Sequence, residues 1–408
     1  MNNTVDTDLE VTELVRAMGE RARAAARVLA GASTARKAAG LSAAADALRE
    51  DEDMILAANG RDMAAAAALS PALRDRLLLT PARLAGIADA VAAVAALPDP
   101  VGHVIDATVR PNGLALQRVR VPIGVIGIVY ESRPNVTADA AVLAVMSGNA
   151  VILRGGSEAT ASNAAIHAAV SRGLTQAGLP PHAVQLMPTA DRAAVGALLA
   201  GEGGIDLLIP RGGKGLVARV QADARVPVLA HLDGVNHVFV HASADPAMAR
   251  AVVLDAKLRR TGVCGAMETL LLDRAWPHGE GLVAELAAAG CAIRRDEAAW
   301  GVEWLDAVAA VAAVDGLDGA LAHIDRYGSG HTEAIVAADE DTAERFLAEV
   351  DAAIVLWNAS TQFADGGEFG LGAEIGIATG RLHARGPVAL EGLTTYKWVG
   401  RGAGQVRG

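Results

Sequence analysis

The feature that most constrains the fold is the alternation of short apolar runs with helix-length segments. A first series of runs comprises Val125–Tyr130, Ala150–Leu153, Val184–Met187, Ile205–Ile209 and Val226–Ala230. A second series comprises His237–His241, Glu268–Asp273, Ala307–Val314, Thr332–Ala337 and Ala352–Trp357. Strands joined by helix-length crossovers predict parallel sheets. We therefore expect an α/β protein with two doubly wound domains, whose ligands bind beyond the carboxyl ends of strands.

The segments that flank these series have other patterns. Residues 9–97 are rich in Ala with scattered Arg and Glu, which favours successive helices, and Thr80-Pro81 is typical of a helix start. Residues 104–121 and 383–399 are rich in Thr, Val, Arg and Gly without a helical period. They are expected to form a protruding hairpin and a returning tail, a kind of element that often makes subunit contacts through edge pairing.

Composition excludes several classes of function. Hydrophobic residues make up 52% of the 408 residues with only 3% aromatics, as expected for strands covered on both faces. The formal charge of -11 argues against nucleic acid as a partner. Met1–Glu10 shows neither a secretory signal nor a transit peptide, and no apolar stretch approaches the roughly 20 residues that span a bilayer. We expect a cytoplasmic enzyme without membrane contact, in which the two cysteines need not form a disulfide.

Cys264 is the first candidate for chemistry. It has a glycine on either side within two residues, and it lies between a helical stretch and the run Glu268–Asp273. Glycines allow close backbone approach to a ligand. A lone cysteine among apolar residues is nevertheless more often a small buried hydrophobe than a nucleophile. Cys291, at an ordinary helix-to-strand joint, is expected to be such a buried residue.

Three loops that follow predicted strands are candidates for binding. Residues 154–158 (Arg-Gly-Gly-Ser-Glu) and 210–215 (Pro-Arg-Gly-Gly-Lys-Gly) each open a helix, where free N–H groups favour an anion. Neither loop matches G-x-G-x-x-G, so each is equally well explained as a tight turn. In residues 130–137, Asn135 has the chemistry of an oxyanion donor, and Arg133 that of a partner for carboxylate or phosphate. By itself, Asn135 is better explained as a turn residue after proline.

The order of these motifs carries a resemblance. It runs Arg-Pro-Asn-Val-Thr, Gly-Asn-Ala-Val-Ile-Leu-Arg-Gly-Gly-Ser-Glu, Ile-Pro-Arg-Gly-Gly, Gly-Val-Cys-Gly-Ala-Met-Glu-Thr, Phe-Gly-Leu-Gly-Ala-Glu-Ile-Gly-Ile, His-Ala-Arg-Gly-Pro and Leu-Thr-Thr-Tyr-Lys-Trp-Val-Gly. From about Leu9 onward the chain resembles the gamma-glutamyl phosphate reductase family of the aldehyde dehydrogenase superfamily. The resemblance reverses the expectation for Cys264.

The resemblance implies a domain organisation. A cofactor-binding domain is expected over residues 1–105 and 123–231, and a catalytic domain over 232–382. An oligomerisation element is expected over 106–122 and 383–408.

It also implies site residues. Cys264 matches the nucleophile, and Asn135 with the backbone N–H of Cys264 matches the oxyanion hole. The expected contacts to NADP(H) are Arg154, Ser157, Glu158, Gly212, Gly213 and Glu303. Arg154 stands where relatives have a lysine that holds the adenosine ribose, and Glu303 matches a glutamate that grips the nicotinamide ribose. Arg133, Arg211 and Arg385 are candidates for the substrate's phosphate and carboxylate.

One departure from the superfamily is informative. Hydrolytic aldehyde dehydrogenases carry a glutamate base before the cysteine, whereas residues 228–234 contain none. Such a base activates water for deacylation. This departure fits an enzyme whose thioester exchanges with phosphate, and the resemblance implies NADPH-dependent reduction of L-glutamate 5-phosphate to glutamate 5-semialdehyde in proline biosynthesis. We expect a homo-oligomer that receives substrate from glutamate 5-kinase. A hydrolytic aldehyde dehydrogenase and a non-catalytic scaffold are the alternatives.

Overall fold

The computed structural model describes residues 2–407 and divides them into two units. Unit 1 comprises the chain up to Ala230, Leu371–Gly376 and the segment from Val388, and unit 2 comprises His231–Gly370 and Ile377–Pro387. Met1 and Gly408, which end two of the predicted domain ranges, lie outside the described residues. The sequence-based boundary at 231/232 differs by one residue from the break at Ala230/His231. No helix among residues 2–407 is long and apolar enough to cross a membrane.

Unit 1 begins with the predicted run of helices. They are α1 (Asn2–Ala30), α2 (Thr34–Glu50), α3 (Glu52–Ala65), α4 (Pro71–Leu77) and α5 (Pro81–Ala95). The predicted start of α5 is confirmed, because the hydroxyl of Thr80 accepts a hydrogen bond from the backbone N–H of Arg83. α1 lies against the central sheet, and α2 contacts α5, α6 and α7.

The sheet of unit 1 is parallel, in the order β5-β4-β3-β6. Its strands are β3 (Val125–Tyr130), β4 (Ala150–Arg154), β5 (Val184–Leu186) and β6 (Leu207–Arg211). The crossovers contain α6 (Asn135–Met146), α7 (Thr160–Gln176) and α8 (Arg192–Leu199), and α9 (Lys214–Asp223) follows β6. The predicted strand at Val226–Ala230 is wrong, since only Val228 makes a single bridge, to Leu208. Pro227 supplies no N–H for pairing, and the chain leaves unit 1 after Ala230.

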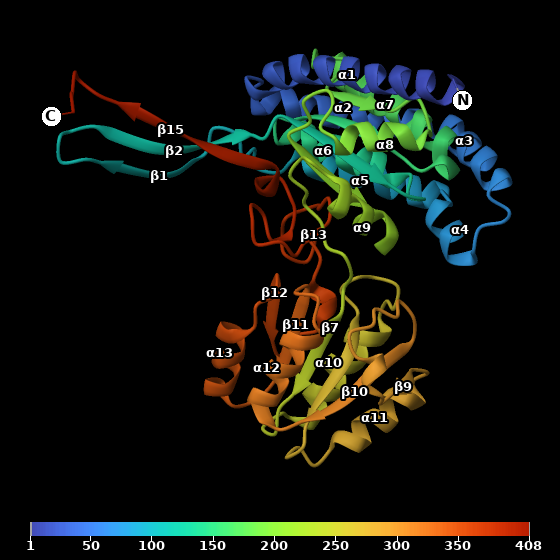
Figure 1. Ribbon diagram of the computed structural model, residues 1–408, viewed down its shortest axis with the longest axis vertical. Helices are drawn as coiled ribbons and strands as arrows, with labels where there is room; N and C mark the ends of the chain where they lie inside the picture. The colour runs from blue at the N-terminus through green and yellow to red at the C-terminus, as the bar shows by residue number, and fades with distance from the viewer. Residues whose placement is uncertain (1, 408) are drawn as a thin grey trace. The chain divides into compact units, whose positions relative to one another are not determined.

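Unit 1 also contains a separate antiparallel sheet, visible at one side in Figure 1, in the order β1-β2-β15. Its strands are β1 (Val104–Val109), β2 (Ala115–Pro122) and β15 (Thr394–Arg401). The predicted hairpin is confirmed, and the predicted return of the tail occurs through pairing of β15 with β2 from Thr394 to Arg401.

Unit 2 is a second parallel sheet, in the order β12-β11-β7-β8-β10-β9. Its strands are β7 (Asn236–Val240), β8 (Met267–Asp273), β9 (Ala292–Arg294), β10 (Val308–Val314), β11 (Thr332–Val336) and β12 (Ile354–Trp357). The short strands β13 (Ile377–Ala378) and β14 (Gly386–Pro387) pair separately. The sequence predicted every strand of this sheet except β9, which has only three residues.

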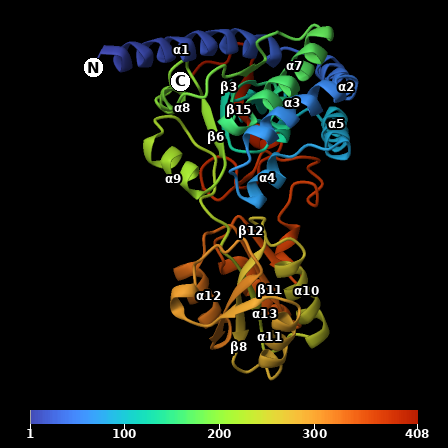
Figure 2. The same cartoon turned by 90° about the vertical axis from the view of Figure 1, so that its right-hand side faces the viewer.

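Helices cover both faces of this second sheet. They are α10 (Pro246–Leu258), α11 (Gly279–Ala288), α12 (Gly316–Tyr327) and α13 (Glu340–Glu349). Val238 and Val240 of β7 belong to the core with α10 and α11, whereas Phe239 belongs to the core with α12 and α13. Figure 2 shows α10 and α12 on opposite sides of the strands. The doubly wound architecture is therefore confirmed here.

Candidate active site

Three loops of unit 1 meet at the carboxyl edge of its sheet. Because β3, β4 and β6 run parallel, the segments after them leave from the same edge. The N–H of Glu131 donates to the carbonyl of Arg211 at 3.1 Å, and Glu131 Oε2 accepts from the N–H of Gly213 at 2.9 Å. The N–H and hydroxyl of Ser132 both donate to Glu158 Oε1 at 2.6 Å. Loops 130–137, 154–158 and 210–215 therefore meet at this edge.

Ser132, where the loop after β3 contacts Glu158, has an unusual backbone conformation. Its φ of 36° lies in the left-handed region that non-glycine residues seldom adopt. Burial opposes ionisation of Glu158, but hydrogen bonds from Ser132 and from the backbone N–H of Glu158, together with the charge of Arg154, keep the pKa of Glu158 below its usual value. Glu158 therefore orders the loop after β3, and its contact with a cofactor stays a prediction. Ser157 is exposed beside it, at the start of a short helical turn.

Asn135 is the first residue of α6, and its side chain is oriented by Asp139, one turn later in the helix. Its Nδ2 donates to Asp139 Oδ2 at 2.9 Å. Burial raises the pKa of Asp139 to about 6, although the bond from Asn135 and the charge of Arg211 oppose the rise. An amide has two N–H donors, and this bond uses one. Arg133 lies in the same loop, directly before Pro134.

Arg154, the last residue of β4, is partly buried, and its guanidinium is fixed by the backbone. Nη1 donates to Gly155 O at 3.1 Å and Nη2 to Ala190 O at 2.6 Å. Its Nε is buried without a hydrogen-bond partner among the described residues. Burial lowers the pKa of Arg154; Glu158 opposes the shift and the positive charge of Arg192 adds to it. Arg192, at the start of α8 after β5, is a neighbouring cation that sequence reasoning missed.

Gly212 and Gly213 are explained by packing within unit 1. A Cβ at Gly212 would lie 2.8 Å from Leu216 Cδ2 and 2.8 Å from the carboxyl carbon of Glu131. The N–H of Gly213, just before α9, already donates to Glu131. The carboxylate of Glu131 thus occupies the place at the helix N-terminus that the sequence predicted for a phosphate, and the phosphate contact stays a prediction.

Cys264 of unit 2 lies in the turn between α10 and β8. Because it precedes β8, it sits at the amino ends of the strands, unlike the carboxyl-edge loops of unit 1. Asn236 Nδ2 donates to the carbonyls of Cys264 at 2.6 Å and Ala266 at 2.8 Å. Asn236 Oδ1 accepts from the N–H of Thr332 at 3.1 Å. One fully buried amide therefore fixes the cysteine turn to the start of β11.

Gly234 passes directly behind this turn. A Cβ there would overlap the carbonyl oxygen of Cys264, so the approach requires glycine. The N–H of Gly234 donates to Glu303 Oε1 at 2.9 Å. Glu303 therefore supports the segment opposite Cys264, and its contact with a nicotinamide ribose stays a prediction.

Two histidines flank the thiol, and sequence reasoning missed both. A ring nitrogen of His231, the Sγ of Cys264 and a ring nitrogen of His331 all lie within 4.8 Å of one another. His231 Nδ1 lies 2.6 Å from the carbonyl oxygen of Ile377. His231 falls in the segment 228–234 that lacks a glutamate, but the three residues are far apart in sequence and only the sheet topology brings them together.

With both sites described, the comparisons with known proteins identify the family. Residues 5–290 match the aldehyde dehydrogenase family model. The gamma-glutamyl phosphate reductase of Novosphingobium aromaticivorans is 66% identical, over 97% of each chain. That of Sphingopyxis alaskensis is 65% identical, over 98% of this chain and 96% of that one. The chain belongs to the gamma-glutamyl phosphate reductase family. The resemblance predicted from its motifs is confirmed.

Solved structures agree on the fold. The gamma-glutamyl phosphate reductase of Thermotoga maritima is 41% identical and aligns with a TM-score of 0.94, covering 97% of this chain and 100% of that one. An acetylating aldehyde dehydrogenase from Geobacillus thermoglucosidasius aligns with a TM-score of 0.72 at 18% identity, over 98% of this chain and 99% of that one. The aldehyde dehydrogenase-like fold expected for the family is confirmed.

Arg385 and Cys291 both belong to unit 2. Arg385 Nη1 pairs with Asp351 Oδ1 at 2.5 Å, and this contact holds the pKa of Asp351 below its usual value. The contact of Arg385 with substrate stays a prediction. In that contact the substrate would compete with Asp351 for the guanidinium. Cys291 is 3% exposed in the core of unit 2, and burial raises the pKa of its thiol to about 11. Its expected burial as a small hydrophobe is confirmed.

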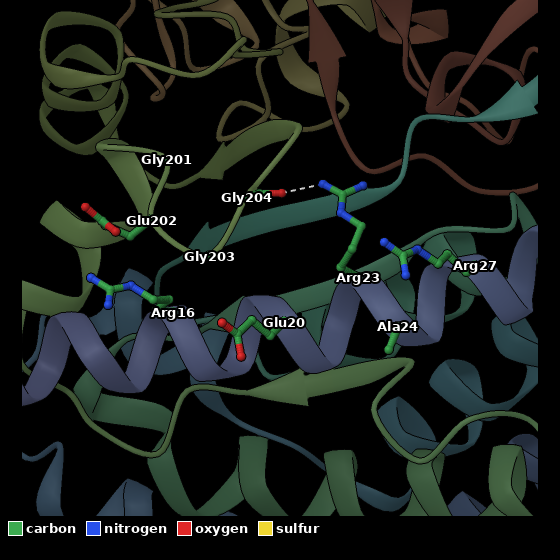
Figure 3. Close-up of a pocket in the computed structure, with 9 residues that line it drawn as sticks. All are labelled: Arg16, Glu20, Arg23, Ala24, Arg27, Gly201, Glu202, Gly203 and Gly204. Atoms are coloured by element: carbon green, nitrogen blue, oxygen red, sulfur yellow. Dashed lines mark hydrogen bonds between the residues drawn. The ribbon is translucent and has the colours of Figure 1, made fainter.

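A surface hollow of about 570 Å³ lies elsewhere, between α1 and the turn Gly201–Gly204 (Figure 3). Arg23 in this hollow donates to the carbonyl of Gly204 at 2.5 Å and pairs with Asp206 at 2.7 Å. Two other arginines line it together with Glu20 and Glu202. None of the predicted site residues lines it, so we do not assign it to the reaction.

Proposed function

We propose that this chain is a cytoplasmic enzyme that reduces L-glutamate 5-phosphate to L-glutamate 5-semialdehyde and phosphate, with NADPH as the reductant. This is the reductive step of proline biosynthesis. The observation that carries the proposal is a glycine-flanked Cys264 held by the buried Asn236, in a chain 66% identical to a gamma-glutamyl phosphate reductase over nearly its full length.

The carboxyl edge of unit 1 fits a phosphorylated dinucleotide. Arg154 and Arg192 place two positive charges near each other, and Arg154 Nε is a buried donor without a partner among the described residues. These properties suit the 2′-phosphate of NADPH. We propose further contacts from Ser157, Glu158, Gly212, Gly213 and Glu303. NADPH, when bound, supplies the hydride for the reduction.

Cys264 is proposed as the nucleophile. Its thiolate attacks the acyl carbon of the acyl phosphate, so that a C–S bond forms and the C–O bond to phosphate breaks, with the electron pair leaving on phosphate. After reduction of the resulting thioester, the C–S bond breaks, the carbonyl re-forms and the thiolate is regenerated. Asn135 and the N–H of Cys264 are proposed to stabilise the oxyanions. Arg133, Arg211 and Arg385 are proposed to bind the substrate's charged groups.

The segment before β7, whose Gly234 lies against Cys264, favours phosphate over water as partner of the thioester. Residues 228–234 contain no glutamate. A glutamate base would activate water and hydrolyse the acyl enzyme. Its absence from that segment preserves the intermediate for reduction.

We also propose that the chain forms a homo-oligomer through the β1-β2-β15 sheet. Val109, Tyr396 and Trp398 on its strands are 70%, 48% and 58% exposed. Exposed aromatic side chains beside a strand edge are typical of an interaction surface. Substrate transfer from glutamate 5-kinase is part of the same proposal, because acyl phosphates hydrolyse readily in water.

The proposed nucleophile is tested by trapping the acyl enzyme. We expect wild type, incubated with semialdehyde and NADP in phosphate-free buffer and then acid-quenched, to gain one acyl group per chain by intact mass spectrometry. Cys264→Ala should lose both the adduct and turnover, whereas the matched control Cys291→Ala should keep both. An adduct or near-normal turnover in Cys264→Ala would rule out the covalent mechanism.

A further inference from the structure

The group formed by His231, Cys264 and His331 has the composition of a zinc site. Thiolate sulfur and imidazole nitrogen are the preferred ligands of Zn²⁺. In tetrahedral zinc sites, metal–ligand distances of about 2.0–2.3 Å place ligand atoms roughly 3.5 Å apart. The three ligand atoms here lie within 4.8 Å of one another, which is close to the spacing of ligands that share one metal.

The Nδ1 of each histidine has a hydrogen-bond partner, and for His231 this partner fixes the tautomer. His231 Nδ1 contacts the carbonyl oxygen of Ile377 at 2.6 Å. A carbonyl can only accept, so Nδ1 carries the proton and Nε2 of the neutral ring carries the lone pair. Histidines that bind metals almost always donate their other N–H to such a carbonyl or carboxylate. The neighbouring backbone has therefore set the tautomer that a metal requires.

His331 adds an independent observation. The side chain is 0% exposed, Nδ1 is bonded to the hydroxyl of Thr332 at 2.8 Å, and Nε2 is buried without a partner among the described residues. A buried polar atom left unbonded costs free energy, and most such atoms in proteins have an explanation. A metal ion bound by Nε2 of His331 would satisfy this nitrogen.

The backbone around the group is fixed, and the group is open to solvent on one side. Asn236 holds both the Cys264 turn and the segment that carries His331. Cys264 and His231 are partly exposed, which provides a path for an ion. A fixed backbone and an access path suit a metal site.

We propose that His231, Cys264 and His331 form a reversible Zn²⁺ site that silences the thiol. On binding, the thiol proton passes to solvent, a Zn–S bond forms, and the lone pair needed for attack is withdrawn; a chelator reverses these steps without any redox change. The inhibition rests on the proposed role of Cys264 as nucleophile, whereas the metal site does not.

Metal binding is tested on the full chain with Co²⁺ as a spectroscopic substitute for Zn²⁺. One Co²⁺ per chain should produce the near-ultraviolet thiolate-to-cobalt band and the intense visible bands of a tetrahedral ion. Cys264→Ala should abolish the thiolate band, and His231→Gln and His331→Gln should each weaken affinity at least tenfold. His278→Gln, on the exposed side of unit 2, is the matched control and should bind as wild type. If His331→Gln fails to fold, the cobalt affinity of His231→Gln, a change at a partly exposed residue, decides whether a histidine binds the metal.

Inhibition is tested separately by adding one equivalent of Zn²⁺ to the active enzyme. Activity should fall more than tenfold and return with EDTA. A thiolate band retained in Cys264→Ala, or wild-type affinity in both histidine variants, would overturn the three-ligand site. Cobalt binding at Cys264 together with full activity in Zn²⁺ would overturn the inhibition and would count against Cys264 as nucleophile, while leaving the metal site intact.

Discussion

At the scale of single residues, the proposed oxyanion donor depends on a carboxyl with an unusual acidity. Asp139 accepts the hydrogen bond that orients Asn135, and burial raises its pKa to about 6. In the unfolded chain the same carboxyl titrates near 3.9. Between these values the unfolded state releases its proton and the folded state keeps it, so rising pH costs stability.

Asp139→Asn should remove this dependence while keeping an oxygen that accepts from Asn135. Relative to the variant, the free energy of unfolding of the wild type should fall by about 1–2 kcal/mol as the pH rises from 4 to 6, and the difference should stay constant above pH 6. This value is smaller than the full pKa shift would give, because the carboxyl is partly exposed. Urea midpoints at pH 4, 5 and 7 measure it. Parallel pH profiles for the two proteins would show that Asp139 titrates normally.

Arg154 is predicted to select the cofactor. Its backbone contacts hold the guanidinium beside Arg192, and a charge-assisted bond to a phosphate is worth about 1.5–3 kcal/mol. Arg154→Gln should therefore raise the apparent KM for NADP roughly 10-fold or more, with little change for NAD. Steady-state semialdehyde oxidation with each cofactor gives the ratio. Equal effects on both would show that Arg154 does not contact the 2′-phosphate.

At the scale of elements, a buried ion pair joins the helix and the strand on either side of Cys264. Lys257 near the end of α10 contacts Glu268 of β8 at 2.7 Å, and both side chains are 0% exposed. Burial raises the pKa of Glu268 to about 7, although Lys257 opposes the shift. The pair therefore depends on mutual compensation, because either charge alone would be buried without a partner.

Glu268→Gln should destabilise the protein by about 3–5 kcal/mol, because it leaves Lys257 unpaired. Lys257→Met combined with Glu268→Leu should recover most of that loss. The exposed pair of Arg326 and Glu297 is the comparison, and Glu297→Gln should cost less than about 1 kcal/mol. Urea unfolding of the full chain measures all three. A loss for Glu268→Gln no larger than that of the exposed pair would contradict this account.

The same elements show what the sequence can predict. Both ends of β3 were predicted correctly. All six positions from Val125 to Tyr130 are buried, so the strand is a continuous apolar run, as is typical of a central parallel strand. Hydropathy does not distinguish the apolar run Val226–Ala230 from a true strand. The run does not pair as a strand because Pro227 lacks an N–H and the chain leaves unit 1 after Ala230. Apolar runs thus identify strands, and backbone chemistry decides which of them pair.

The candidate site was predictable to the extent that topology determines it. Parallel pairing alone requires the loops after β3, β4 and β6 to meet. The bonds of Ser132 to Glu158 depend on one backbone angle that no pattern encodes. His231 and His331 approach Cys264 only because β11 and β8 both lie beside β7, an order that hydropathy does not reveal.

At the scale of the whole molecule, two α/β units supply different parts of one proposed reaction. Unit 1 contains the arginines and loops suited to a phosphorylated cofactor, and unit 2 contains the thiol. In the proposed reaction, phosphate is the leaving group in reduction and the acceptor in the reverse direction. The central claim of this mechanism is therefore that the thioester on Cys264 exchanges with phosphate and not with water.

The most direct test is the phosphate dependence of NADPH formation during semialdehyde oxidation. Without phosphate, the account predicts a burst of at most one NADPH per active site, because the thioester persists. Phosphate should start continuous turnover, and arsenate should sustain it as a mimic that gives an unstable acyl product. A steady rate in phosphate-free buffer equal to that with phosphate would show that water is the acceptor, as in a hydrolytic aldehyde dehydrogenase.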